Sequence, residues 1–222
     1  IGGLAWIALA WGVARLAPPP WLSAALDRAF GADADARWIT YGTLVALAVP
    51  FMLRVFLLHG VSILDDEEAY RLQAELLASG QLAGDSHPLK LFFDSPFTVN
   101  DGRYYAIYFL GWPMLMAPLA PLGLTGFVGC LCAAATVAPL FLAARRFAGS
   151  TAAKVAVLLF VLSPTLMVSA ATGLALAAVL AALAWLAWAA VRATDDDARP
   201  WHHAGVAVAF CAAFWIRPQD AL

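Results

Sequence analysis

One uncharged run decides the fold class. Residues 155–191, VAVLLFVLSPTLMVSAATGLALAAVLAALAWLAWAAV, contain no Asp, Glu, Lys or Arg, and the same holds for residues 104–144. Both runs are longer than the roughly 20 residues with which an α-helix crosses a bilayer. In the whole chain 63% of the residues are hydrophobic and 13% are charged, whereas soluble domains average about 45–50% apolar and about 25% charged residues. The sequence therefore predicts an all-α integral membrane protein.

The other apolar segments extend this run to a multi-span helical bundle of about five or six helices. Pro18, Pro19 and Pro20 end the first segment, because their rings cannot continue a helix. Since the chain starts at Ile1 and stops inside an apolar segment, we expect it to be the front part of a longer protein. The expected spans are residues 1–16, 38–59 and 124–144, two within 152–191 that separate near 169–173, and one that begins near Ala204.

One long polar stretch, residues 60–103, interrupts the apolar segments. It holds more than half of the 15 acidic residues and therefore needs water beside it. Prolines cut residues 104–123 into pieces too short to cross, and Trp and Tyr in this segment favour the membrane interface. We therefore divide the chain into N-terminal spans (1–59), an external loop with juxtamembrane helices (60–123) and the helices of a membrane bundle (124–222).

Basic residues predict the orientation, because Lys and Arg gather in short cytoplasmic loops. Arg145, Arg146 and Lys154 lie close together between two expected spans. With this loop inside, the acidic stretch lies on the outer side of the membrane.

Residues 64–80 predict a short amphipathic helix that lies flat on the membrane. Asp65 and Glu68 have the spacing of an N-terminal capping box, and Gly80 suits a left-handed stop. A line of polar groups, Asp66, Tyr70 and Gln73, follows the i, i+4, i+7 spacing of one helix face. Asp66 in this line is either a functional carboxylate or a residue that favours the positive end of the helix dipole.

Outside this helix, isolated cations and one turn are the remaining candidates. Asp101-Gly102 predicts a small hairpin, in which Arg103, like Lys90, either meets a phosphate or balances nearby carboxylates. Arg217 ends an apolar run, and a charge at membrane depth is usually kept for a partner or a site; the alternative is snorkelling to the interface. For Arg54 we favour snorkelling, and for Glu67 an ordinary i, i+4 pair with Arg71.

Several function classes find no support in the sequence. The net charge of -2 gives no reason to expect a nucleic acid as partner. The three cysteines lie in apolar runs, where a thiol behaves as a small hydrophobe. The four histidines lack metal-site spacing with a carboxylate or thiol.

The order of several short motifs resembles a known family, the membrane glycosyltransferases of the GT-C type. The similarity covers about residue 60 to the end and is strongest to the bacterial protein O-mannosyltransferase-like and aminoarabinose lipid A transferase-like group. Its motifs are Asp66-Glu67-x-x-Tyr70, Gln73-Ala74, Leu77-Ala78-Ser79-Gly80, Asp101-Gly102-Arg103-Tyr104-Tyr105, Gly111-Trp112-Pro113, Ala144-Arg145-Arg146-Phe147, Ser163-Pro164 and Arg217-Pro218.

The resemblance implies a site and a substrate. Asp66, with Glu67 beside it, would be the base or acceptor-binding carboxylate, and Arg217 would hold the phosphate of a polyprenyl-phosphate-linked sugar. The acceptor, a lipid, glycan or protein, would be modified at the periplasmic or extracellular face of a bacterial inner membrane. A divalent cation is left open, because residues 169–173 lack the polar His or Asp of many relatives. The residues expected to shape the pocket for the sugar and the lipid are Tyr70, Gln73, Tyr105 and Trp112.

A rival reading is a transporter or flippase, in which Arg217 and the external helix bind the same lipid-linked substrate without chemistry. Broken helices at mid-membrane would favour transport. The concentration of polar residues in one external loop favours catalysis at the membrane surface instead.

Overall fold

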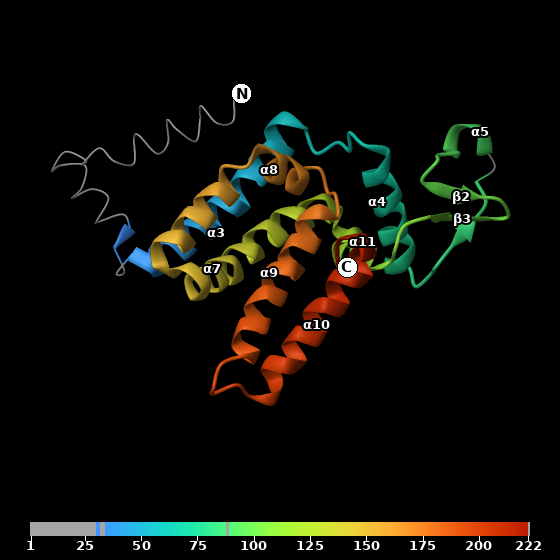
Figure 1. Ribbon diagram of the computed structural model, residues 1–222. Helices are drawn as coiled ribbons and strands as arrows, with labels where there is room; N and C mark the ends of the chain where they lie inside the picture. Colours follow the sequence, from blue (N-terminus) through green and yellow to red (C-terminus); the bar gives the residue numbers. More distant parts are fainter. Residues whose placement is uncertain (1–29, 32–33, 88, 222) are drawn as a thin grey trace, which may run out of the picture.

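The computed structural model describes residues 30–31, 34–87 and 89–221, and this part of the chain is mostly helical (Figure 1). The first expected span, residues 1–16, and most of the connector after it lie outside the described residues. The described helices and a small sheet together show how the acidic loop meets the apolar helices.

Among the described residues, three helices are long and apolar enough to cross a membrane. The first, 35–57, is α3 (Asp35–Met52) continued by a π-helical turn, η2 (Leu53–Leu57). The second is η4 (Thr125–Phe127) with α7 (Val128–Val161), and the third is α9 (Leu176–Ala193). These lengths and compositions are compatible with a helical membrane protein.

Helix α7 is broken at Gly149, whose φ of 84° and ψ of 175° are not helical. Val137 and Val157 lie 157 − 137 = 20 residues apart, which is about 30 Å along a straight helix, yet a Cβ at Gly42 of α3 would touch both valines. The chain therefore reverses at Gly149, and Figure 1 shows the two halves of α7 running back along each other. This break lies within the polar loop expected between residues 144 and 152.

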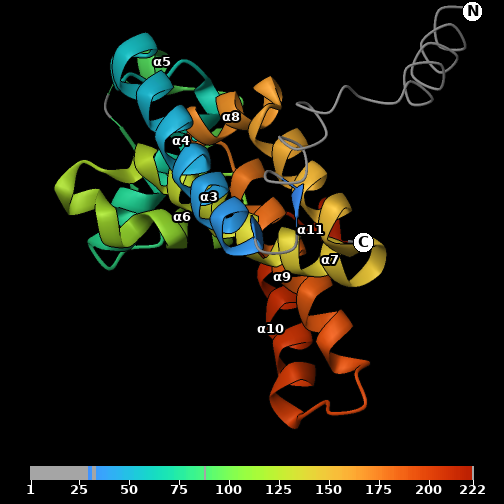
Figure 2. The same cartoon turned by 90° about the vertical axis from the view of Figure 1, so that its left-hand side faces the viewer.

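Helices α9 and α10 form an antiparallel pair, and α9 packs against α7. After the short α8 (Pro164–Ala171), α9 descends and α10 (Pro200–Ile216) returns alongside it, as Figure 2 shows from the side. The expected separation near residues 169–173 is the connection between α8 and α9. A last turn, α11 (Pro218–Ala221), follows Arg217.

A belt of ion pairs ties the helices together at the end opposite the acidic loop. Lys154 is fully buried, and its Nζ pairs with Asp35 at 2.7 Å. Arg145 pairs with the same carboxylate at 3.3 Å, and Arg146 pairs with Asp195 at 3.3 Å. Lys154, which we expected in the loop between two spans, instead lies within α7 and is buried, whereas Arg145 and Arg146 are exposed.

The loop contains a small sheet, so the described chain is not all-α. Strands β1 (Gly84–Asp85) and β2 (Thr98–Asn100) pair antiparallel with the two sides of β3 (Arg103–Ala106). The hairpin of β2 and β3 turns at Asp101-Gly102, as expected, and aligns Asn100 with Tyr104. Strand β1 is too short for an alternating pattern to reveal it in the sequence.

Helix α4 (Asp65–Ala78) lies between the sheet and the bundle (Figure 1). The expected capping box is wrong, because Leu64 is the N-cap and no side chain caps the helix. Gly80 stops it as expected, at φ 78°, with hydrogen bonds from Gly80 N to Leu77 O and from Gln81 N to Leu76 O, the pattern of a Schellman motif.

The face that α4 turns toward the protein differs from the apolar stripe of Ala69, Leu72 and Leu76 that the helical spacing predicts; Leu72 and Leu76 are only half-buried. Tyr70, Gln73 and Ala74 are buried together with Ala69, because α4 packs on α6 (Gly111–Met116) and on the 3₁₀-helix η3 (Ala117–Leu122). The line through Asp66, Tyr70 and Gln73 thus faces the rest of the protein.

Candidate functional site

A pocket of about 220 Å³ opens where α4, the segment after β3, the α8–α9 connection and the end of α10 meet. Asp66 and Tyr70 come from α4, Tyr108 and Phe109 follow the sheet, and Arg217 lies at the end of α10. The other lining residues are Leu174, Ala175, Leu176, Ile216 and Gln219. Residues distant in the sequence thereby face one small space.

Local structure explains how these side chains arrive there. Asp66 and Tyr70 lie on one face of α4, since residues four apart are neighbours on a helix. The Tyr108 ring lies against that of Tyr70, with 4.4 Å between centroids. Helix α10 ends at Ile216, so Arg217 has an extended backbone, with φ −150° and ψ 96°, at the rim of the pocket.

The pocket combines one carboxylate, one guanidinium and two tyrosines. Burial and the charge of Asp66 raise the pKa of Tyr70 to about 12, although Arg217 opposes this rise. Burial, together with a hydrogen bond to Asp66, also holds the pKa of Tyr108 far above its ordinary value. Both phenols are therefore neutral at physiological pH, and Tyr108 donates a hydrogen bond to the Asp66 carboxylate.

Arg217 also has a partner of its own. Its Nε lies 3.2 Å from Oδ2 of Asp220, in the last turn of the described chain, and its side chain is 34% exposed. The guanidinium is thus oriented by α11 while it lines the pocket.

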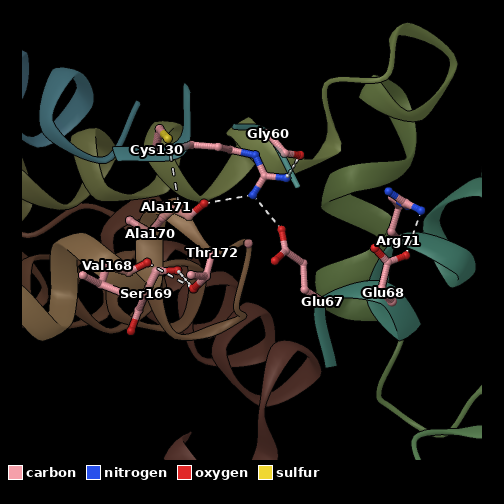
Figure 3. Close-up of polar contacts among 12 residues, drawn as sticks. Gly60, Glu67, Glu68, Arg71, Cys130, Val168, Ser169, Ala170, Ala171 and Thr172 are labelled. Carbon is pink, nitrogen blue, oxygen red and sulfur yellow. Dashed lines mark hydrogen bonds and ion pairs between the residues drawn. The ribbon is translucent and has the colours of Figure 1, made fainter. Parts of the chain in front are cut away.

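Glu67 lies behind the pocket rather than in it. Its Oε1 is 2.6 Å from Nη1 of Arg54, and both side chains are buried, with exposed fractions of 2% and 7%. Figure 3 shows Glu67 pointing toward Gly60 and Ala171, away from Glu68 and Arg71. Burial raises the pKa of Glu67, while the hydrogen bond and charge of Arg54 oppose this rise.

Two expected side-chain arrangements are therefore wrong. Glu67 does not pair with Arg71, which instead contacts Glu68 at 2.7 Å and Glu75 at 3.6 Å on the exposed face of α4. Arg54 does not snorkel, because its guanidinium also donates to Ala171 O at 2.9 Å and to Gly60 O at 3.3 Å.

Gln73 and Trp112 are buried in the walls around the pocket and do not line it. The Gln73 amide donates to Leu82 O at 2.9 Å and accepts from Ala106 N at 3.0 Å, so it fastens the sheet to α4. Trp112 is fully buried and donates from Nε1 to Gly173 O at 2.8 Å. Anchoring at the lipid interface does not describe this tryptophan.

Arg103 and Tyr105 lie on β3, away from this pocket. Arg103 is exposed and lines a separate open pocket with residues 80–83 and Asp85, while Tyr105 is 36% exposed. Lys90 lies 3.6 Å from Asp101, so this cation balances a carboxylate. In the part of the chain that the structure describes, no group of three His, Cys, Asp or Glu side chains is arranged to hold a metal ion.

Two residues at or behind the pocket were not selected from the sequence. Tyr108 belongs to the aromatic segment that suggested interfacial anchoring, and nothing in its spacing links it to Asp66. Arg54 did have a usable signal, since a lone charge inside an apolar span usually has a partner or a function.

No protein-family model, curated protein or solved structure matches the chain.

Proposed function

We propose that this protein is a membrane glycosyltransferase that moves a sugar from a polyprenyl-phosphate donor to an acceptor at the outer face of a bacterial inner membrane. The observation that supports the proposal most is that Asp66 and Arg217 line one pocket at the end of α10, in a chain with helices long enough to cross a bilayer. A lipid-linked sugar stays at the membrane surface, so its enzyme needs its reactive groups there.

The proposed reaction uses the two charges in opposite roles. Asp66 removes the proton from an acceptor hydroxyl as general base. The acceptor oxygen then bonds to the anomeric carbon of the sugar while the bond from that carbon to the phosphate oxygen breaks. The electron pair leaves with the polyprenyl phosphate, whose negative charge Arg217 stabilises. Tyr70 and Tyr108, as neutral donors, orient Asp66 or hydroxyls of the sugar.

An apolar groove next to the pocket supports a lipid donor. This groove of about 330 Å³ shares Phe109 with the pocket and is otherwise lined by Phe210, Cys211, Phe214 and Trp215 of α10. An isoprenoid chain is apolar and extended, so it suits such a groove while its phosphate remains at Arg217.

The test expresses the full-length protein in membranes and supplies undecaprenyl phosphate carrying radiolabelled mannose, glucose or arabinose. We expect Asp66→Asn to lower kcat by about 10²- to 10⁴-fold, the contribution typical of a general base. Arg217→Gln should weaken donor binding as well as transfer. Matched controls are Asp65→Asn and Arg71→Gln, which change neighbouring exposed charges outside this pocket.

Donor binding is measured separately through Cys211, which is exposed and lines the groove. Undecaprenyl phosphate should protect Cys211 from a maleimide in the parent protein and in Asp66→Asn, but less in Arg217→Gln. Undiminished transfer by Asp66→Asn would remove the carboxylate from the reaction. Protection without transfer of any sugar, together with movement of the lipid across proteoliposome membranes, would instead identify a transporter.

A further inference from the structure

We infer that the buried Arg54–Glu67 pair is a positioning device, which sets Asp66 of α4 against Arg217 of α10. The inference rests on the proposed function in assigning a task to Asp66. It gives Glu67, the acidic neighbour of Asp66, a role that involves no contact with substrate.

Arg54 joins three segments through three acceptors. From the π-helical turn at the end of α3, its guanidinium reaches Glu67 of α4, Gly60 of the connecting loop and Ala171 at the end of α8. Figure 3 shows these contacts converging between α4 and α8. π-helical turns occur often at functional sites, and this one places a cation inside the protein, where it is 6% exposed.

Glu67 ties down the first turn of α4, where Asp66 lies. Since no side chain caps this helix, the ion pair is a polar anchor at the start of the helix. Adjacent helical residues point about 100° apart, so Glu67 faces Arg54 while Asp66 faces the pocket. A tilt or rotation of this turn would move the Asp66 carboxylate away from Arg217.

The same pair also supports the opposite wall of the pocket. The Glu67 carboxylate packs on Gly173, where a Cβ would lie 3.0 Å from Oε1. The next three residues, 174–176, line the pocket, and the carbonyl of Gly173 is held by Trp112. The Arg54–Glu67 ion pair therefore supports both walls of the pocket.

The structure leaves little freedom around the pair. A Cβ at Gly126 would overlap the Arg54 guanidinium, and the second oxygen of Glu67, Oε2, is buried without a hydrogen-bond partner among the described residues. Gly126→Ala therefore displaces Arg54 without changing any charge. Gly205→Ala, whose added Cβ meets Ala189 at an ordinary 3.5 Å, is the matched control.

The first measurement needs no activity. Cysteines replace Asp66 and Gln219, which line the same pocket, in a Cys211→Ala background, and a short bismaleimide joins them. We expect the rate of cross-linking to fall several-fold when Gly126→Ala or Glu67→Gln is added and to stay unchanged with Gly205→Ala. Unchanged cross-linking in both variants would overturn the inference, whether or not any sugar is transferred.

The second measurement separates positioning from catalysis and from simple loss of fold. With Asp66 present, Gly126→Ala and Glu67→Gln should lower kcat by about 10²-fold, the effect of misplacing a reacting group by about 1 Å. Protection of Cys211 by undecaprenyl phosphate should persist, and Glu67→Asp should regain part of kcat. A loss of kcat that only follows the folded fraction, or one without any change in cross-linking, would contradict the proposal. If Gly126→Ala does not fold, the cross-linking rate and kcat of Glu67→Gln alone test the inference.

Discussion

Trp112 shows how a single side chain supports the pocket without lining it. Its indole N–H satisfies the carbonyl of Gly173 in a turn that also contacts Glu67. A buried carbonyl that loses its donor costs about 1–3 kcal/mol. The hydrogen bond therefore matters for stability as well as for the geometry of the α8–α9 connection.

Trp112→Phe should consequently lower the free energy of unfolding by about 1–3 kcal/mol, measured by denaturant or thermal unfolding in detergent. Trp185→Phe is the control, because Trp185 on α9 is 48% exposed. Equal stability of the two variants would show that the hydrogen bond to Gly173 contributes nothing.

The partners of buried charges were the least predictable residues. Local spacing favoured a Glu67–Arg71 pair, and helical neighbours of opposite charge do attract each other by a few tenths of a kcal/mol. The observed partner of Glu67 lies 13 positions away, across a loop. A buried charge needs a partner far more than an exposed one does, so burial decided the pairing.

Among the elements, the break in α7 depends on one residue. The φ of 84° and ψ of 175° at Gly149 fall in a region that only glycine occupies readily. An added Cβ would meet nothing within 4 Å, so the cost of a substitution there is purely conformational.

Gly149→Ala should therefore destabilise the protein by about 1–3 kcal/mol. Gly205→Ala in the interior of α10 should be neutral or stabilising by up to about 1 kcal/mol, since alanine favours a helix over glycine. Unfolding of both variants in detergent gives the comparison, and equal stability would mean that the reversal does not depend on the conformation of residue 149.

The type and the ends of the helices and strands were easier to predict from the sequence than the face that each helix buries. The sequence indicated α4, its stop at Gly80 and the hairpin at Asp101-Gly102, because those signals are local. The face that α4 buries was not indicated correctly, since it depends on α6 and η3, which come some 40 residues later.

At the scale of the whole molecule, charged groups gather at two opposite ends of the helices. Arg54, Glu67, Asp66 and Arg217 lie at the end next to the sheet, and the Asp35 belt lies at the other end. Helices α3 and α9 run in opposite directions between these ends. This arrangement is the one expected of helices that span an apolar layer with water on both sides.

The proposed orientation predicts a labelling pattern. In a Cys211→Ala background, Ser79→Cys after α4 should react with a membrane-impermeant maleimide in spheroplasts, while Ala148→Cys near Gly149 should react only after permeabilisation. Both positions are exposed, so a difference in maleimide reactivity between them shows on which side of the membrane each one lies. The reverse pattern would put the Asp66 pocket on the cytoplasmic side and exclude the proposed reaction at the outer face.

The sequence by itself determined the apolar helices, the polar stretch between them and helix ends such as Gly80. Hydrophobic runs, prolines and glycines influence only the backbone of the segment in which they lie. Only the tertiary structure decided that Asp66, Tyr108 and Arg217 share one pocket and that Arg54 holds Glu67. Both features depend on packing between segments that lie far apart in the sequence, as far as 151 positions for the pocket (217 − 66). For Arg54 and Glu67, burial makes an unpaired charge more costly than the approach of a distant partner.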